Sequence, residues 1–145
     1  MKKILFVLAF LFPILSFAVE AGPVASVIIQ FGLLGHWAVD CSLPPSASNP
    51  YGTYEVSDGV STLTYEFGPQ YYNRVWTFTM ATISENDSII LVASLPDGTI
   101  SNMTLRKANG KIQNYQAVES TGVVRIKDGI YTINGKEAAW LKRCN

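Results

Sequence analysis

The sequence predicts an all-β fold, an antiparallel meander β-barrel of about 8–10 short strands with a short helix before the first strand. Apolar and polar residues alternate in many short segments, which is the pattern of strands with one buried face. Pairs that favour tight hairpin turns, such as Asp58-Gly59 and Asn109-Gly110, separate these segments. Because closure removes the exposed edges of such a sheet, a barrel is favoured, and a two-sheet sandwich is the alternative.

Residues 1–18 have the features of a cleaved secretory signal peptide, with a second candidate cleavage site after Ala21. A short basic start precedes a nearly unbroken apolar run over residues 4–17, and small residues follow that run. The run is too short for a membrane span, so we expect none in the mature chain. The sequence therefore predicts an exported bacterial protein, periplasmic or secreted, with a single domain over residues 19–145.

The mature chain is close to neutral, which argues against a nucleic-acid partner. Removal of residues 1–18 takes away two lysines, so the eleven basic residues of the whole chain become nine, against eleven acidic ones. The remaining basic residues are scattered along the sequence and form no basic stripe. We therefore expect no nucleic-acid binding. The composition leaves the oligomeric state open.

Residues 23–31 are predicted to form the short helix. Its apolar residues fall at the i, i+3, i+4, i+7 spacing of one helix face, namely Val24, Val27, Ile28 and Phe31. Pro23 suits the first helical position, and Gly32 suits the residue at which a helix ends. An extended segment is the alternative, because valine and isoleucine favour strands.

The alternation of apolar and polar residues continues from residue 34 to the end of the chain. The predicted strands are 34–41, 51–57, 60–67, 74–83, 88–95, 99–106, 111–118, 123–127, 130–133 and 136–143. Residues 42–50 interrupt this series and contain three prolines. Because proline cannot donate a hydrogen bond to a neighbouring strand, this segment is expected to be an irregular loop.

The two cysteines, Cys41 and Cys144, are predicted to form a disulfide between the first and last strands. Two cysteines in an exported protein are most simply a disulfide pair. Each of them follows a tryptophan by four residues, Trp37 in one case and Trp140 in the other. Closing a loop of about 100 residues would contribute roughly 4–5 kcal/mol to stability in the chain-entropy model.

The positions of the cysteines predict that the first and last strands pair in parallel. In an antiparallel pair, a bond between the C-terminal ends of both strands would leave little overlap between them. A parallel pair places Trp37 beside Trp140 and lets Asp40 form an ion pair with Arg143. This arrangement needs an odd number of strands in the ring, so two predicted segments would merge or one would lie outside the barrel.

The start of the first strand, Gly35-His36-Trp37, follows the predicted helix and resembles the Gly-x-Trp opening of lipocalin-like barrels. Avidin-like barrels begin in a similar way. The resemblance to lipocalins implies that Trp37 plugs the closed end of the barrel. It also implies that a basic side chain near the last strand, Lys142 or Arg143, covers this tryptophan.

The end of the chain resembles small periplasmic lysozyme inhibitors, which are exported β-barrels with a single disulfide. Gly135-Lys136-Glu137-Ala138-Ala139 before Cys144 is similar to their closing strand. The Ser-Gly-x-x-Tyr loop by which those inhibitors engage an enzyme is missing from this sequence. Inhibition of an enzyme would therefore need a different loop.

Aromatic side chains at alternating positions of neighbouring strands are candidates for lining a ligand cavity. The candidate ligand-binding residues are Tyr54, Tyr65, Trp76, Phe78 and Tyr115, with Phe67 on the same face. Such an interior is either a packed core or a cavity, and the periodicity does not distinguish the two. Four polar residues alternate on one hairpin and face either this interior or solvent: Asn102, Thr104, Asn114 and Gln116.

Tyrosines in two turns form a second candidate site, a protein-binding surface. Tyr71 and Tyr72 lie in the turn 68–73, and Tyr51 follows the loop 42–50. Exposed tyrosines bring a large contact area at little cost in side-chain entropy, which suits protein recognition. Local packing within the turns explains the same residues equally well.

The sequence contains no catalytic or metal-binding pattern, so we expect no enzyme activity, cofactor or metal. His36 is the only histidine, and no partner stands at a metal-ligand or general-base spacing from it. No Gly-x-Ser-x-Gly motif occurs. The sequence thus predicts an exported barrel that binds a small apolar or amphipathic ligand. The alternative is a protein-binding module, such as an inhibitor of a cell-wall-degrading enzyme.

Overall fold

A short helix, α1, precedes the first strand, as the spacing of its apolar residues predicts. The computed structural model of the protein describes residues 23–84 and 87–145, and α1 spans Pro23–Phe31 within them. The helix buries Ala25, Ile28 and Phe31 and packs against β3 (Val60–Glu66) and β4 (Arg74–Ser84). It ends at Gly32, whose φ of 76° is the left-handed conformation that glycine adopts at helix ends.

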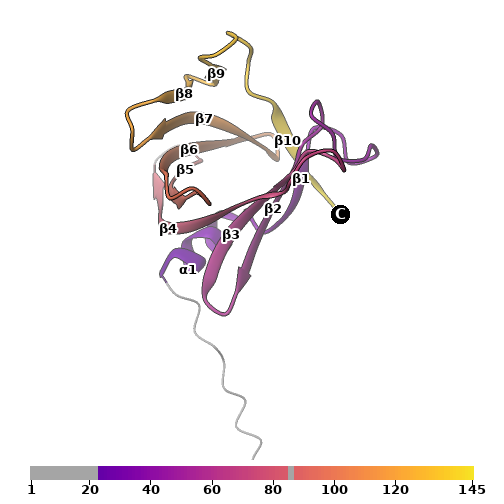
Figure 1. Cartoon of the computed structure of the whole chain (residues 1–145). Helices are drawn as coiled ribbons and strands as arrows, with labels where there is room; N and C mark the ends of the chain where they lie inside the picture. Colours follow the sequence, from indigo (N-terminus) through magenta and orange to yellow (C-terminus); the bar gives the residue numbers. More distant parts are fainter. Residues whose placement is uncertain (1–22, 85–86) are drawn as a thin grey trace, which may run out of the picture.

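The remaining elements form an antiparallel sheet that closes on itself (Figure 1). The other strands are β1 (Gly35–Ala38), β2 (Tyr51–Ser57), β5 (Ser88–Ser94), β6 (Ile100–Ala108), β7 (Lys111–Glu119), β8 (Val124–Lys127), β9 (Ile130–Tyr131) and β10 (Trp140–Cys144). The predicted signal peptide, residues 1–18 or 1–21, lies outside the described residues. None of the helices in the described part of the chain is long and apolar enough to cross a membrane.

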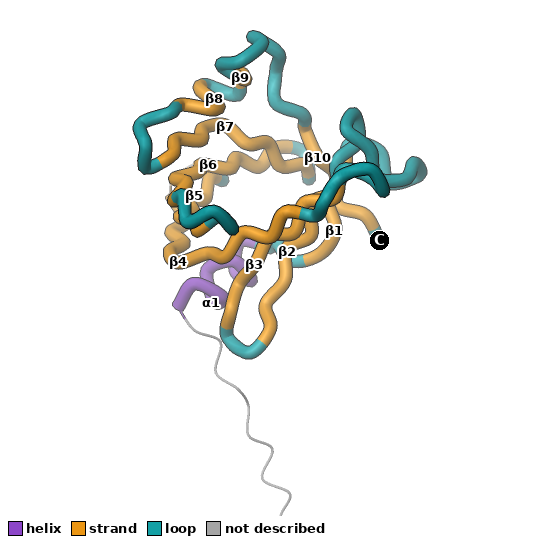
Figure 2. The backbone as a smooth tube through the Cα atoms, viewed as in Figure 1, coloured by secondary structure: helices purple, strands orange, loops and turns teal. Residues whose placement is uncertain are grey.

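The barrel is a ring of eight strands, with β8 and β9 outside the ring (Figure 2). Strands β1 to β7 pair in chain order, and β10 closes the ring by pairing with both β1 and β7. Strand β7 serves two neighbours on the same edge: Ile112 pairs with Leu141 of β10, and Ala117 pairs with Ile126 of β8. The predicted meander barrel with a short N-terminal helix is therefore confirmed.

The prediction of a parallel seam between the first and last strands is wrong. Strands β1 and β10 are antiparallel, with His36 opposite Cys144 and Trp37 opposite Arg143. The prediction assumed that Cys41 lies within the first strand, whereas β1 ends at Ala38 and the chain then bends and turns. This turn brings Cys41 beside the end of β10, so the antiparallel register and the disulfide are compatible.

The predicted disulfide between Cys41 and Cys144 is confirmed, with a Cα–Cα distance of 5.4 Å. The other expected contacts of the seam are not formed. Trp140 pairs with Gln113 of β7 and does not lie beside Trp37 in the sheet. The ion pair of Asp40 is with Lys142, at 3.7 Å between Nζ and Oδ1, because antiparallel pairing places Lys142 opposite Ala38.

The packed core occupies the part of the interior around α1 and β1. Trp37 is 3% exposed, and its indole Nε1 donates a hydrogen bond to the Leu33 carbonyl at 2.6 Å. Side chains from all around the ring join this cluster, among them Leu63, Phe78, Ile89, Leu91 and Met103. The Lys107 ammonium donates to the Phe31 carbonyl at the end of α1 and lies 4.4 Å from the Phe31 ring centroid. These contacts fasten the helix to the ring.

Candidate functional site

A cavity of about 400 Å³ opens into the barrel among β3, β4, β6, β7, β8 and β9. We call it the outer cup. No residue of α1 lines it, and its wall is largely aromatic and apolar. The uncharged residues of this wall include Tyr65, Phe67, Trp76, Asn114, Ala117, Ile126 and Tyr131. The interior is therefore packed around α1 and β1 and hollow in this second region.

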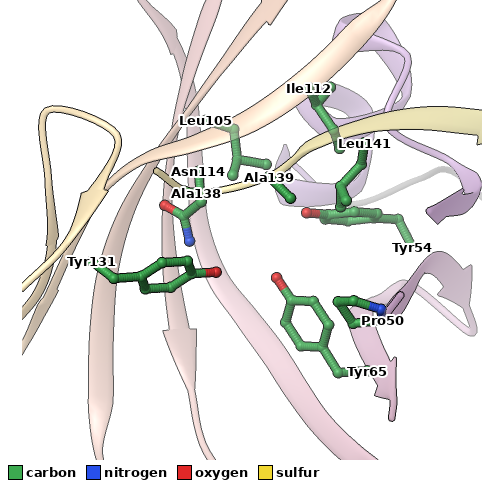
Figure 3. Close-up of a pocket in the computed structure, with 10 residues that line it drawn as sticks. All are labelled: Pro50, Tyr54, Tyr65, Leu105, Ile112, Asn114, Tyr131, Ala138, Ala139 and Leu141. Atoms are coloured by element: carbon green, nitrogen blue, oxygen red, sulfur yellow. The ribbon is translucent and has the colours of Figure 1, made fainter. Parts of the chain in front are cut away.

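A smaller cavity of about 70 Å³, the inner chamber, adjoins the outer cup (Figure 3). The two cavities share four lining residues: Pro50, Tyr65, Asn114 and Tyr131. The inner chamber also contacts Tyr54 and the nearly fully buried Leu105 and Ile112. Figure 3 shows the hydroxyl groups of the three tyrosines pointing into the space between them. The chamber is thus a polar pocket set in an apolar wall.

The structure brings three of the five candidate ligand-binding residues together at these cavities. Tyr54 lines the inner chamber, Trp76 lines the outer cup, and Tyr65 lines both. The rings of Tyr65 and Trp76 meet edge to face, with their centroids 5.3 Å apart. Phe78 packs into the core against Tyr54, at 6.1 Å between ring centroids, and lines neither cavity.

Tyr115, the fifth candidate, also lines neither cavity, because a β-bulge in β7 changes the direction of its side chain. Leu105 of β6 pairs with Asn114, whereas Thr104 pairs with Gln116, so Tyr115 has no partner opposite it. Its ring stacks on the Arg106 guanidinium, whose Cζ lies 4.5 Å from the ring centroid. The bulge also separates the two polar residues that flank Tyr115. Asn114 lines both cavities, and Gln116 lies on the outer surface.

Tyr131 lines both cavities and was not among the candidates. It lies in β9, in the short β8–β9 hairpin that pairs with β7 outside the ring. The buried Gln113 side chain holds the following segment to β7 by donating a hydrogen bond of 2.8 Å to the Ala138 carbonyl. The sequence predicts a strand over residues 130–133, but its alternation does not show which of its side chains faces a cavity. The role of Tyr131 depends on where the hairpin folds back.

Two polar atoms in the wall of the outer cup are buried without a hydrogen-bond partner among the described residues. They are the indole Nε1 of Trp76, a donor, and the Oδ1 of Asn114, an acceptor. Buried polar groups in proteins are almost always satisfied, because an unpaired one costs roughly 1–3 kcal/mol. Both side chains line this cavity, but the two atoms themselves are covered in the structure, so a bound molecule would pair with them only after a small shift of the side chains.

The tyrosines of the inner chamber are held in their neutral form. Burial raises the pKa of Tyr54 well above its usual value, and the neighbouring Tyr65 adds to this effect. Burial and the nearby Tyr131 likewise raise the pKa of Tyr65, and partial burial raises the pKa of Tyr131. Each phenol can therefore both donate and accept a hydrogen bond at neutral pH.

The buried tyrosines predict a loss of stability at alkaline pH. Above about pH 10 the unfolded chain releases the protons of Tyr54 and Tyr65, whereas the folded chain retains them because their pKa values are raised. The unfolded state then binds fewer protons, so the free energy of unfolding falls by up to about 1.4 kcal/mol per pH unit for each tyrosine. Urea unfolding at pH 9 and pH 11 measures the fall. A Tyr54→Phe/Tyr65→Phe variant should show a smaller fall, and an unchanged one would contradict this assignment.

Charged residues lie at the rim of the outer cup and are absent from the inner chamber. Arg125 and Glu119 form an ion pair at the rim, at 2.7 Å between Nε and Oε1. The Arg74 guanidinium, also at the rim, lies 5.8 Å from the centroid of the Phe67 ring. None of the described residues that line the inner chamber carries a charge. Of these two cavities, only the outer cup is therefore lined by charged side chains, and the inner chamber is lined by neutral residues.

The two loops predicted to bind a protein form one surface. Gly68 lies so close to the loop 42–50 that a Cβ atom added to it would be 2.8 Å from the Pro45 carbonyl oxygen. Tyr71 is 53% exposed and Tyr72 98% exposed. They line an open groove of about 630 Å³ together with Ala47, Phe67, Gln70 and Arg74. We call this the loop groove.

His36 lies away from both cavities and from the loop groove. Its Nδ1 is 2.8 Å from the Thr53 hydroxyl on the neighbouring strand, which is a structural contact between β1 and β2. Within residues 23–84 and 87–145, no group of three histidine, cysteine, aspartate or glutamate side chains is arranged to hold a metal ion.

No protein-family model, curated protein sequence or solved structure matches the chain. The resemblances to lipocalin-like barrels and to lysozyme inhibitors rest on short motifs and on architecture alone.

Proposed function

We propose that this protein binds a small apolar or amphipathic molecule in the outer cup and inner chamber. The observation that carries the proposal is an aromatic-walled cavity of about 400 Å³ with an unpartnered donor on Trp76 and an unpartnered acceptor on Asn114. Pockets for small ligands typically measure about 300–1,000 Å³ and combine apolar walls with a few polar groups. The outer cup has this size and this composition.

The architecture supports the same proposal. A ring of about eight strands encloses an interior that is either filled by side chains or holds one small ligand, as in lipocalins. The lipocalin-like opening supports a barrel that is closed at one end. Trp37 is buried in the core near α1. In the pairing of β1 with β10 it lies opposite Arg143, as the resemblance implies for a basic residue near the last strand. The Cys41–Cys144 disulfide supports a periplasmic or secreted location, because disulfides persist in oxidising compartments.

Binding of N-phenyl-1-naphthylamine, an uncharged dye that fluoresces in apolar surroundings, tests this proposal. We expect a saturable rise in dye emission with one site per protein. Ala117→Phe should reduce binding at least tenfold, because Ala117 is a buried residue of the outer cup and a phenyl ring would occupy the cavity.

The matched control is Val118→Phe, at the next residue of the same strand. Val118 lies on the outer surface of the barrel, opposite the exposed Asn102. This variant should bind the dye as the wild type does, and circular dichroism should show that both variants fold. Failure of the wild type to bind the dye at one site, or equal binding by both variants, would contradict the proposal.

The loop groove favours a second candidate function, binding of another protein. The rings of Phe67 and Tyr71 meet edge to face, with their centroids 6.4 Å apart. Tyr72 is almost completely exposed. Asn49 fixes the neighbouring loop by donating to the Asp40 carbonyl at 2.9 Å and accepting from the Asp40 N–H at 2.9 Å. A rigid surface with exposed tyrosines suits an inhibitor of a cell-wall-degrading enzyme.

Lysis of bacterial cell walls by a lysozyme tests the second candidate. We expect the wild type to slow lysis at concentrations near that of the enzyme, and Tyr72→Ala to weaken inhibition about tenfold or more, as at interface hot spots. Ile133→Ala is the control, because Ile133 is 84% exposed and lies outside the loop groove. Absence of inhibition would contradict the enzyme target, and undiminished inhibition by Tyr72→Ala would contradict the loop groove.

A further inference from the structure

The chemistry of the inner chamber restricts which end of a ligand can enter it. Four polar side chains face this space, those of Tyr54, Tyr65, Tyr131 and Asn114, and the remaining lining is aliphatic or proline. Each phenol and the carboxamide can donate and accept hydrogen bonds. The volume of about 70 Å³ exceeds the ~10–15 Å³ needed for one water molecule, so a small polar group fits.

A charged group would be poorly accommodated in the inner chamber. Burial of an ion is costly unless an opposite charge pairs with it, and the described lining of the chamber contains no charged residue. The charged residues that line the outer cup are Arg74, Glu119 and Arg125, and none of them lines the inner chamber. Glu119 and Arg125 already neutralise each other. The chamber therefore favours a neutral hydrogen-bonding group.

The outer cup suits the apolar part of the same molecule. Its wall presents the rings of Trp76 and Phe67, and Tyr65 contacts both of them, at 5.3 Å and 5.9 Å between ring centroids. Aromatic rings pack well against flat apolar groups. The shared lining residues make the two cavities neighbours, so one ligand can reach both.

We propose that the barrel takes uncharged amphipathic molecules head first, with a hydroxyl, carbonyl or carboxamide group among the inner-chamber tyrosines and Asn114, and with the apolar body against Trp76 and Phe67. This inference rests on the proposed function and specifies the ligand class for the same site. It excludes two other classes: wholly apolar ligands, which leave the polar groups unpaired, and ligands that place a charged head inside.

Four probes with one shared ring system test the inference: 2-naphthol, 2-naphthamide, 2-methylnaphthalene and 2-naphthoate. Titration at pH 7, followed by the change in intrinsic protein or probe fluorescence, gives a Kd for each. We expect 2-naphthol and 2-naphthamide to bind about tenfold or more tightly than the apolar and anionic members. In a Tyr65→Phe/Tyr131→Phe variant this preference should fall to about twofold or less, because 2-naphthol and 2-naphthamide lose hydrogen-bond partners and 2-methylnaphthalene no longer leaves these hydroxyls unpaired.

Tyr115→Phe is the matched control, because Tyr115 stacks on Arg106 and lines neither cavity. It should keep the full preference for the polar probes. Equal affinities across the series, or tightest binding of 2-naphthoate, would overturn the inference and leave the proposed function standing. Absence of binding by all four probes would contradict the proposed function itself, and the inference with it.

Discussion

Replacement of both Cys41 and Cys144 by serine is expected to lower the free energy of unfolding by about 4–5 kcal/mol. The bond joins residues 103 positions apart, so its loss frees almost the whole described chain in the unfolded state. The chain-entropy model gives about 4.7 kcal/mol for a loop of about 100 residues, and loss of a native disulfide typically costs roughly 2–5 kcal/mol. Urea unfolding of the wild type and the double variant measures the difference.

The location of the disulfide makes this prediction more specific. It links the turn after β1 to the end of β10, and these two strands close the ring with only four and five residues. Amide hydrogen exchange in β1 and β10 should therefore rise more than in β5 and β6, which pair over seven residues. Reduced wild type serves as the control and should match the variant. A difference below about 1 kcal/mol would contradict the importance of this closure.

Trp37→Ala is expected to lower the free energy of unfolding by about 3–5 kcal/mol, the usual cost of removing a large buried aromatic side chain. Trp37 is 3% exposed and packs within the core, and its indole donates to the Leu33 carbonyl. The substitution leaves a cavity in the core beside Leu33. It also leaves this carbonyl without its donor. Thermal and urea unfolding measure the loss.

Trp140→Ala is the matched control for Trp37. Trp140 is only half-buried, and its ring lies 5.1 Å from the Arg106 guanidinium. Exposed cation–π contacts contribute about 0.5–1 kcal/mol, so this variant should lose far less stability than Trp37→Ala. Equal losses in the free energy of unfolding would show that the two tryptophans contribute equally to stability. The closed end would then have no special role in stability.

The regular part of the fold could be predicted because its local signals agree. The predicted helix 23–31 has the bounds of α1, and the predicted strand 51–57 has the bounds of β2. In these segments the apolar residues repeat with the period of the element, and turn residues mark its ends. Asp58 and Asn109, for example, adopt the positive φ that the predicted hairpin turns require.

The closure of the barrel could not be predicted in detail because the sequence pattern continues past the ends of two strands. Val39 and Asp40 extend the alternation of β1, yet the strand ends at Ala38. The predicted last strand likewise includes residues 136–139, whereas β10 begins at Trp140. Where such strands end is decided by contacts with distant segments, such as the hydrogen bond between Gln113 and Ala138. Local periodicity contains no information about these contacts.

The candidate site was predicted only where strand alternation is regular. Tyr54, Tyr65 and Trp76 line the cavities because β2, β3 and β4 keep their period-two pattern through these residues. Tyr115 does not line a cavity, because the bulge in β7 turns its side chain away. No glycine or proline in the sequence indicates this bulge. Tyr131 enters the site through a tertiary contact of the β8–β9 hairpin.

Strand β7 pairs with β10 over its first half and with β8 over its second half, so different parts of β7 close the ring and hold the cavity-lining hairpin. Its first half holds β10 and so completes the ring, whereas its second half holds the β8–β9 hairpin that supplies Tyr131 and Ile126 to the cavities. Under the proposed function, substitutions in the hairpin would change the walls of the cavities and leave the pairing of β10 with β7 in place. The disulfide and Trp37 lie outside this hairpin. The residues that shape the cavities through this hairpin can therefore vary independently of the contacts that close the barrel.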